Sequence, residues 1–208
     1  MQVLFTSDGS VTSSGFEATW TLEERDGTEI FGGATSCIDC VAGKYLETEG
    51  NDAEADCVLC ARGTYSYSVG VSVCLDCVSG KYADTEGNDQ ESDCRLCGRG
   101  KYSGASGASS AATCTDCPSG TYLDTEGNDQ ESDCILCRKG KYSGATGAST
   151  CTNCPNGKYL DTEGNTAESD CVLCGAGKYS ATSGMRSCVS CGAGKYLTTE
   201  GNDEEADC

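Results

Sequence analysis

Apolar residues are sparse along this chain and follow no long periodic pattern. Leu, Ile, Val and Phe together number 27 of 208 residues, fewer than a chain usually needs to order itself by burying apolar area. No segment repeats apolar residues at helical spacing, and Gly-Asn or Gly-Ala steps interrupt the chain at short intervals. The pattern predicts short strands and turns, not helices.

Near the N-terminus, apolar and polar residues alternate in two short stretches. Val3 and Phe5 form the first stretch, and Phe16, Ala18 and Trp20 form the second. Such alternation is typical of half-buried strands, and the Ser- and Gly-rich residues between the stretches suit a connecting loop. We therefore expect a pair of strands at the start of the chain.

Nineteen cysteines change this picture, because they are a source of order that does not depend on apolar burial. Their fraction is typical of a disulfide scaffold. In the chain-entropy model, closing a loop of about 15 residues contributes roughly 3 kcal/mol to stability. Disulfides at this density persist only in oxidising compartments, so the cysteines predict an extracellular protein, either secreted or the ectodomain of a membrane protein.

The cysteines define a tandem repeat. They form C-x-x-C pairs that are separated alternately by long and short gaps, and the segment 84–94, D-T-E-G-N-D-Q-E-S-D-C, recurs unchanged at 124–134. Repeats begin at Cys37, Cys74, Cys114, Cys151 and Cys188. We call the part from one C-x-x-C pair to the next a half-repeat. Long half-repeats begin at those five residues, and short half-repeats begin at Cys57, Cys94, Cys134 and Cys171.

Nine of the ten tyrosines stand five residues after the second cysteine of a pair, each following Gly-Lys or Gly-Thr. These repeat tyrosines are Tyr45, Tyr65, Tyr82, Tyr102, Tyr122, Tyr142, Tyr159, Tyr179 and Tyr196. We expect the glycine to allow a turn beside a disulfide, and the ring to pack over that bridge as a small core. A tyrosine stripe that stacks against a ligand is the alternative.

The formal net charge is −19, and the chain contains no histidine. Such a charge excludes nucleic acid and anionic membrane surfaces as partners, and leaves cations and basic proteins. The absence of histidine removes the commonest general base and metal ligand, so we expect no enzyme and no required cofactor. Of the 33 acids, 24 lie in the loops of the long half-repeats. We interpret these loops as solvated turns, with calcium binding as the alternative, although the EF-hand spacing is absent.

Cysteine order suggests a connectivity in which the second cysteine of each pair bonds the first of the next, so that each bridge encloses one repeat tyrosine. The nine expected bridges are Cys40–Cys57, Cys60–Cys74, Cys77–Cys94, Cys97–Cys114, Cys117–Cys134, Cys137–Cys151, Cys154–Cys171, Cys174–Cys188 and Cys191–Cys208, and Cys37 is left unpaired. A crossed scheme that joins Cys37 to Cys57 and Cys40 to Cys60 strands Cys191 instead. Sequence alone leaves both open.

Four-thiolate zinc sites are the main rival to disulfides, because the spacing C-x2-C-x16-C-x2-C suits them. The unbroken series of pairs, the equally regular 13-residue gaps and the acidity of the chain favour disulfides. Redox catalysis by C-x-x-C requires a thioredoxin-like context that this sequence lacks.

The units C-x-x-C-x-x-G-K-Y at 74–82 and S-G-A-T-G-A-S-T-C at 143–151 resemble the ephrin-receptor-like cysteine-rich repeat, which is similar in style to the modules of tumour-necrosis-factor receptors. The resemblance covers 37–208. It implies small extracellular modules, mainly irregular with short β-hairpins, joined by nearest-neighbour disulfides and stacked into an elongated rod. It implies no kinase.

The segment 3–20 resembles the closing strands of a CUB domain, through its F-x-S-D-x-S and G-F-x-A-x-aromatic signatures. The resemblance implies β-strands from a truncated sandwich, and in calcium-binding CUB domains it would make Asp8 a ligand. The expected organisation is a CUB-like end at 1–21, a linker at 22–36, repeats at 37–73, 74–113, 114–150 and 151–187, and a partial repeat at 188–208.

These expectations together predict a non-catalytic spacer and protein-interaction region of a receptor or adhesion-type ectodomain, with an extracellular protein ligand or self-association as its partner. The alternative is a secreted matrix component that assembles through calcium or an intermolecular disulfide. No run approaches the roughly 20 apolar residues of a membrane span, and no secretory signal follows Met1. We therefore expect the chain to be a fragment of a longer protein.

Overall fold

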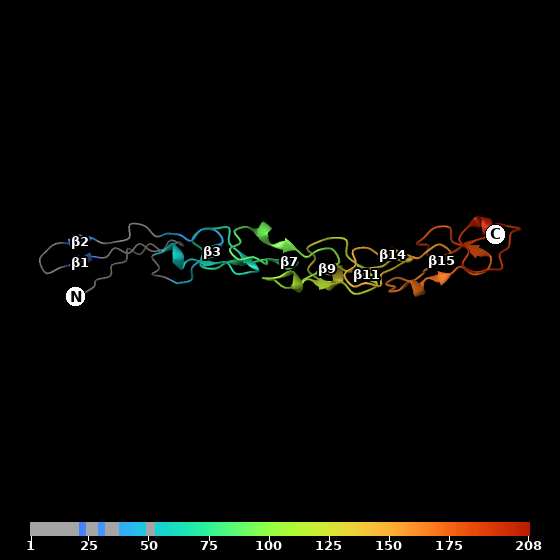
Figure 1. Cartoon of the computed structure of the whole chain (residues 1–208), viewed down its shortest axis with the longest axis horizontal. Helices are drawn as coiled ribbons and strands as arrows, with labels where there is room; N and C mark the ends of the chain where they lie inside the picture. Colours follow the sequence, from blue (N-terminus) through green and yellow to red (C-terminus); the bar gives the residue numbers. More distant parts are fainter. Residues whose placement is uncertain (1–20, 24–28, 32–37, 49–52) are drawn as a thin grey trace. The chain divides into compact units, whose positions relative to one another are not determined.

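The computed structural model of the chain describes residues 21–23, 29–31, 38–48 and 53–208 (Figure 1). In these residues the regular structure consists of very short strands and 3₁₀ helices, with no α-helix. The prediction of a disulfide-rich chain of small hairpins in tandem is confirmed. The shortness of the elements follows from the glycines and disulfides, which interrupt every run before a longer element can form.

From Lys44 onward, each hairpin joins a Lys-Tyr or Thr-Tyr pair to the two residues between the cysteines of the next C-x-x-C pair. In β11 (Thr121–Tyr122) and β12 (Ile135–Leu136), for example, Thr121 pairs with Leu136 and Tyr122 with Ile135 in an antiparallel register. The other antiparallel pairs are β3 (Lys44–Tyr45) with β4 (Val58–Leu59), β5 (Thr64–Tyr65) with β6 (Leu75–Asp76), β9 (Lys101–Tyr102) with β10 (Thr115–Asp116), β13 (Lys141–Tyr142) with β14 (Thr152–Asn153), β15 (Lys158–Tyr159) with β16 (Val172–Leu173), and β17 (Lys178–Tyr179) with β18 (Val189–Ser190). Strands β7 (Lys81–Tyr82) and β8 (Arg95–Leu96) occupy the corresponding sequence positions.

Every long half-repeat closes with one 3₁₀ turn just before the next cysteine. These turns are η1 (Glu54–Asp56), η2 (Glu91–Asp93), η4 (Glu131–Asp133), η5 (Glu168–Asp170) and η6 (Glu205–Asp207). The short half-repeat that begins at Cys94 has three more residues than its relatives, and it accommodates them in η3 (Ala111–Thr113), which contains no acid.

The buried residues are mainly the second cysteine of each pair and the residue that follows each repeat tyrosine. Cys60, Cys77, Cys97, Cys117, Cys137, Cys154 and Cys174 have no exposed surface. The position after the tyrosine alternates between Ala or Leu in long half-repeats, as at Ala83 and Leu123, and Ser in short ones, as at Ser103 and Ser143. Sulfur and one Leu, Ala or Ser side chain per half-repeat therefore take the place of a large apolar core.

By its contacts the chain divides into two compact units whose segments alternate along the sequence. Unit 1 comprises Met1–Cys77, Ala83–Arg95 and Gly107–Ser110, and unit 2 comprises Val78–Tyr82, Leu96–Ser106 and Ala111–Cys208. Each contact described below lies within one unit.

The predicted linker at 22–36 contains regular structure. Strand β1 (Thr21–Glu23) pairs with β2 (Glu29–Phe31) in an antiparallel register that sets Leu22 opposite Ile30. Asp26-Gly27, which lies between the strands in the sequence, is a strong hairpin signal that the linker prediction overlooked. The CUB-like stretch at 3–20, including Asp8, lies outside the described residues, as does Cys37.

Candidate functional site

A disulfide closes each half-repeat by joining its second cysteine to the next cysteine along the chain. The bridges join Cys40–Cys57, Cys60–Cys74, Cys77–Cys94, Cys97–Cys114, Cys117–Cys134, Cys137–Cys151, Cys154–Cys171, Cys174–Cys188 and Cys191–Cys208. These are the pairs of the nearest-neighbour scheme, and they use every cysteine of the sequence other than Cys37. The thiols that a zinc site would need are thus in disulfides from Cys40 onward.

Backbone hydrogen bonds connect each half-repeat to the next in a repeated way. Between the half-repeats that begin at Cys114 and Cys134, the Cys137 amide donates to the Gly120 carbonyl at 2.9 Å, and the Gly147 amide donates to the Cys117 carbonyl at 2.8 Å. Two further bonds run from Gly120 to Ser143 at 2.8 Å and from Leu123 to Ala148 at 3.0 Å. The equivalent four bonds are present at every earlier junction and at the next two, and the last junction has three of them.

Glycine is required at this junction for two independent reasons. Gly120 has a φ of 80°, in the left-handed region that L side chains rarely adopt. A β-carbon at Gly120 would also collide with the carbonyl oxygen of Gly164, which belongs to the half-repeat after the next one. Contacts therefore extend over two half-repeats. The expectation of a turn at this glycine is confirmed, and its close packing could not be read from the sequence.

The glycine in the middle of each half-repeat loop packs against a different kind of side chain in long and in short half-repeats. In long half-repeats this glycine packs against the leucine that precedes the second cysteine of the half-repeat before, as Gly164 does against Leu136. In short half-repeats it packs instead against an acid or amide, as Gly147 does against Asp116. The other pairs are Gly87 with Leu59, Gly127 with Leu96 and Gly201 with Leu173, and Gly70 with Asp39, Gly107 with Asp76 and Gly184 with Asn153.

Two repeat tyrosines show that these rings pack across the junctions. Tyr65, enclosed by Cys60–Cys74, packs with Ala83 and the following bridge Cys77–Cys94. Tyr142 likewise lies against the cluster of Cys154, Leu160 and Cys171. Most of these rings are half-buried, whereas Tyr196, in the half-repeat that begins at Cys188, is 80% exposed. Tyr65 and Tyr142 thus pack against the next disulfide, whereas the bridge that encloses each ring was the expected partner.

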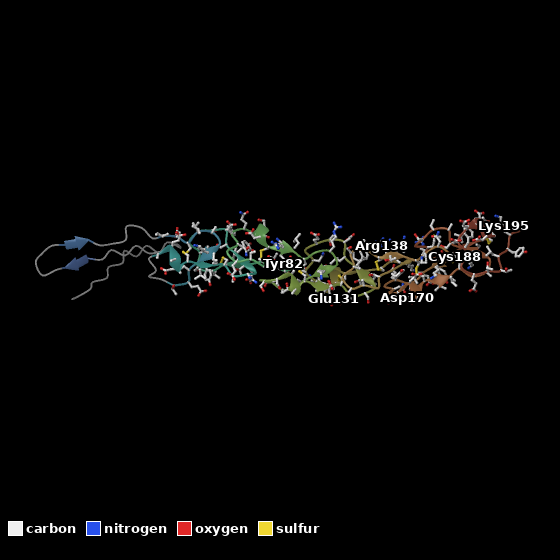
Figure 2. The ribbon with its side chains drawn as sticks, viewed as in Figure 1. Tyr82, Glu131, Arg138, Asp170, Cys188 and Lys195 are labelled. Atoms are coloured by element: carbon white, nitrogen blue, oxygen red, sulfur yellow. A yellow bond between two sulfur atoms is a disulfide. The ribbon has the colours of Figure 1, made fainter. Side chains whose placement is uncertain are left out.

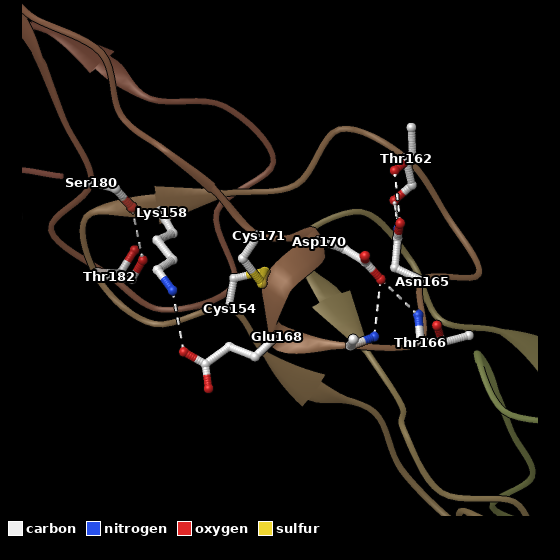
Figure 3. Close-up of a disulfide and its surroundings, with 11 residues drawn as sticks. Cys154, Lys158, Thr162, Asn165, Thr166, Glu168, Asp170, Cys171, Ser180 and Thr182 are labelled. Carbon is white, nitrogen blue, oxygen red and sulfur yellow. Dashed lines mark hydrogen bonds and ion pairs between the residues drawn. A yellow bond between two sulfur atoms is a disulfide. The ribbon is translucent and has the colours of Figure 1, made fainter. Parts of the chain in front are cut away.

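The acidic loops are folded by their own polar side chains. Figure 3 shows the loop around Cys154–Cys171, in which the Asp170 carboxylate accepts hydrogen bonds from the amides of Thr166 at 3.0 Å and Ala167 at 2.9 Å. The Thr162 hydroxyl donates to the Asn165 side-chain oxygen at 3.1 Å. Asp56, Asp93, Asp133 and Asp207 accept in the same way from the start of their 3₁₀ turns. One acid in each long loop is thus committed to the fold.

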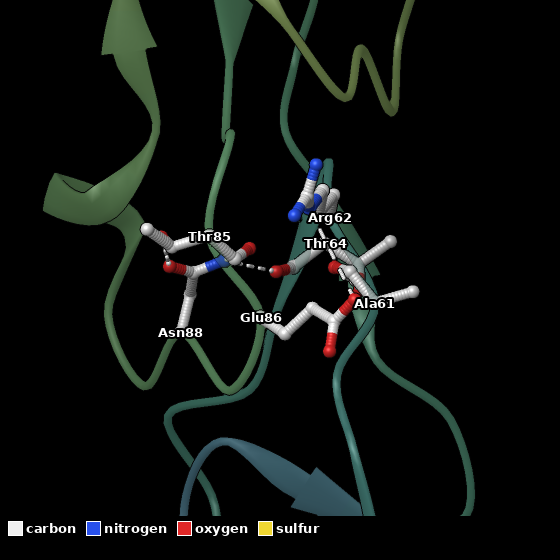
Figure 4. Close-up of polar contacts among 6 residues, drawn as sticks. All are labelled: Ala61, Arg62, Thr64, Thr85, Glu86 and Asn88. Atoms are coloured by element: carbon white, nitrogen blue, oxygen red, sulfur yellow. Dashed lines mark hydrogen bonds and ion pairs between the residues drawn. The ribbon is translucent and has the colours of Figure 1, made fainter.

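Polar contacts also join neighbouring half-repeats. Figure 4 shows the Asn88 side-chain amide, which donates to the carbonyl of Thr85 at 2.8 Å in its own loop and to the carbonyl of Thr64 at 3.1 Å in the preceding half-repeat. Arg62 forms an ion pair with Glu86 at 4.0 Å across the same junction. Because both charged side chains are largely exposed, this pair contributes little to stability.

Tyr102 and Glu131 form a junction contact that changes a titration. Burial, and then the negative charge and hydrogen bond of the Glu131 carboxylate, raise the pKa of the Tyr102 hydroxyl.

Figure 2 shows Glu131, Arg138 and Lys195 pointing outward from the ribbon, where they are exposed. The described surface between 53 and 208 therefore carries charged side chains of both signs.

Among the described residues, no group of three or more His, Cys, Asp and Glu side chains is placed to hold a metal ion. The proposed calcium binding by the acidic loops has no preformed site there, and Asp8 cannot be placed. In the same part of the chain, no helix has both the length and the apolar character to cross a membrane.

The geometry of bridged, tyrosine-containing half-repeats agrees with a comparison against protein families. The model described as tyrosine-protein kinase ephrin type A/B receptor-like matches residues 48–94, 125–171 and 164–208, which is more than half of the chain. The chain belongs to this ephrin-receptor-like family. No curated protein matches it. The family's cysteine-rich repeats are non-catalytic in general, and with nine disulfides they point to an extracellular module. Nothing in the comparisons supports the CUB resemblance, which stays a prediction.

Proposed function

We propose that these ephrin-receptor-like repeats form a non-catalytic spacer and protein-interaction region of a receptor or adhesion-type ectodomain. The observation that carries the proposal is the repeated junction. Because the same backbone bonds, glycine contacts and disulfides recur from one half-repeat to the next, a further half-repeat would extend the array without a new kind of contact. Length can then be set by the number of repeats.

The surface of the repeats supports the interaction part of this proposal. The core consists mainly of disulfides and the one residue that follows each repeat tyrosine, so many of the other side chains are available to solvent. Loops on such a scaffold can vary in sequence without changing the junctions, which is how binding residues are often presented. An extracellular protein ligand is therefore the class of partner that we propose.

One feature favours a second function, a secreted matrix component that assembles through an intermolecular disulfide. The nine bridges use all cysteines except Cys37, so this residue has no cysteine partner left in the chain. Sedimentation of the chain with and without reductant separates the two functions. A reductant-sensitive dimer that Cys37→Ser abolishes supports assembly, and a monomer under both conditions supports the spacer.

Repeat deletion tests the spacer role. We would delete 114–150, or duplicate it in place, and measure the largest dimension of each chain by small-angle X-ray scattering. The proposal expects a shortening and a lengthening of equal size, with complete sets of disulfides by mass. Replacement of 114–150 by a flexible Gly-Ser linker of equal length is the control, and should give a broader distribution of dimensions. Equal dimensions in the deleted and duplicated chains would contradict a spacer.

A further inference from the structure

The loop of the first short half-repeat differs from its counterparts in carrying large apolar side chains. Tyr67, Val69 and Val73 stand where the corresponding loop of the half-repeat that begins at Cys134 has Gly144, Thr146 and Thr150. Loop length and the repeat cysteines are the same in both. The fold therefore does not require the apolar residues, and their presence needs another reason.

These side chains face solvent and surround a cavity. Tyr67 is 67% exposed, Val73 is 63% exposed, and Val69 and Leu75 are also exposed. The loop residues and Leu75 line a cavity of about 480 Å³. An exposed group of apolar residues around a hollow is typical of an interaction site. We call Tyr67, Val69, Val73 and Leu75 the apolar loop patch.

The ring of Tyr67 lies next to that of Tyr65. Its ring centroid lies 6.4 Å from that of Tyr65, with an angle of 34° between the planes. Tyr65 is itself buried against Ala83 and the Cys77–Cys94 bridge. A ligand that packs on Tyr67 would therefore immobilise few further side chains, and a low entropy cost of binding is favourable for an anchor residue.

Charge around the patch indicates what kind of partner it fits. The segment 66–75 contains no charged residue. Asp39 approaches the middle of this loop so closely that a β-carbon on Gly70 would lie 2.8 Å from its Oδ1, whereas the Asp76 carboxylate lies against Gly107 in the next half-repeat. Asp39 is exposed, and Arg62, in the same half-repeat as the loop, is paired with Glu86. Asp39 thus gives the apolar loop patch an acidic neighbour in a chain of net charge −19.

We propose that the apolar loop patch binds an extended segment of another protein that carries Lys or Arg residues beside one apolar anchor side chain. The anchor would fill the cavity against Tyr67, and the cationic groups would lie near Asp39. This proposal deepens the interaction role proposed above and rests on it. Attraction between opposite charges would guide association, and contact with the anchor would supply most of the affinity.

The test uses the complete chain and a displayed library of random twelve-residue peptides. Selection on the natural chain, with counter-selection on a Tyr67→Gly, Val69→Thr, Val73→Thr variant, should enrich peptides that combine Lys or Arg with one large apolar residue. Synthetic copies should bind the natural chain at least tenfold more tightly than the variant. Asp39→Asn, a residue type that the repeat itself uses at Asn153, should weaken binding about threefold.

Two matched controls make the result decisive. The variant's new residues occur at the same positions in the half-repeat that begins at Cys134, so the variant should retain nine disulfides by mass. Peptides with Lys and Arg replaced by Glu should lose binding. Enrichment of acidic peptides, or failure to enrich any, would overturn the proposal. So would dimerisation of the natural chain that the variant abolishes, because the occupant would then be a second copy. If the variant binds the selected peptides as tightly as the natural chain does, the proposal is wrong and the peptides bind elsewhere, while the spacer role is unaffected.

Discussion

Long and short half-repeats share one backbone but use different side chains to hold their loops. The Cys154–Cys171 half-repeat has an acidic loop fastened by Asn165 and Asp170. The Cys137–Cys151 half-repeat has a loop of small residues, and Ser143, just before it, is buried with its hydroxyl donating to the Ala145 carbonyl at 3.2 Å. Backbone bonds at their junctions are nevertheless the same. The difference teaches that the disulfides and glycines build the array, while the loops are free to diverge.

A second difference lies in the contact that each kind of loop makes with its predecessor. Leucine meets the long loop and an acid or amide meets the short one, as Leu136 and Asp116 show. Since the contacts alternate, a long loop placed where a short loop belongs would face the wrong side chain. We infer that each kind of loop is matched to the side chain that the preceding half-repeat presents to it.

Removal of one disulfide should have the largest effect, and a similar one in both kinds of half-repeat. Cys137→Ala with Cys151→Ala opens a loop with a sequence separation of 14, and Cys154→Ala with Cys171→Ala opens one of 17. Loop entropy predicts a loss of about 3 kcal/mol in each case. Hydrogen exchange read by mass spectrometry measures the local opening free energy. A loss below about 1 kcal/mol in either would show that packing holds the half-repeat without its bridge.

Substitution of a junction glycine should cause the second-largest loss of stability. Gly120→Ala combines a positive φ with a backbone collision, and should cost about 2 kcal/mol by the same hydrogen-exchange measurement. Gly98→Ala is the matched control because its β-carbon meets nothing within 4 Å, and it should change the free energy by less than about 0.5 kcal/mol. Equal effects of the two substitutions would contradict the close approach of neighbouring half-repeats.

Exchange of the residue that packs against a loop glycine should cause a smaller loss of stability. Leu136→Asp removes a half-exposed leucine from Gly164 and should destabilise the junction by about 1 kcal/mol. Asp116→Asn should be nearly neutral, because Asn153 occupies the same position in the following repeat. Urea unfolding followed by circular dichroism measures both. If Leu136→Asp proves as neutral as Asp116→Asn, the alternation has no role in ordering the half-repeats.

Titration of Tyr102 should reveal the weakest of these contacts. Its pKa is raised in the folded chain, so the contribution to stability is present at neutral pH and is lost as the pH rises through the folded pKa. The difference in ultraviolet absorbance between the natural chain and Tyr102→Phe reports this titration. Glu131→Gln should lower the pKa, whereas Glu126→Gln, which removes a charge from the same loop, should change it less. Equal shifts would indicate a general charge effect.

Cysteine and tyrosine spacing predicted the modular, disulfide-rich fold because those positions recur within each repeat. The packing partners could not be predicted in the same way. Tyr142 lies on the bridge of the next half-repeat and Leu136 meets Gly164 far along the sequence, and spacing within one repeat does not show which neighbour a side chain meets. The residue after each repeat tyrosine alternates in the sequence between Leu or Ala and Ser. Apolar periodicity did not identify this position as buried, because serine is polar.

The apolar loop patch was visible only as a deviation from the repeat. Tyr67 is the one tyrosine outside the repeat position, and this could have marked the loop before the structure was known. The hairpin of β1 and β2 was missed for a different reason, since the Asp-Gly signal at 26–27 was assigned to a linker.

Peptide mapping of the oxidised chain at acid pH tests the central claim most directly, because the order of every half-repeat is attributed to its own bridge. The account predicts nine linked peptide pairs, from Cys40–Cys57 to Cys191–Cys208, with Cys37 alkylated before reduction. Crossed pairs such as Cys37–Cys57 with Cys40–Cys60, or reduced cysteines that hold zinc, would contradict it.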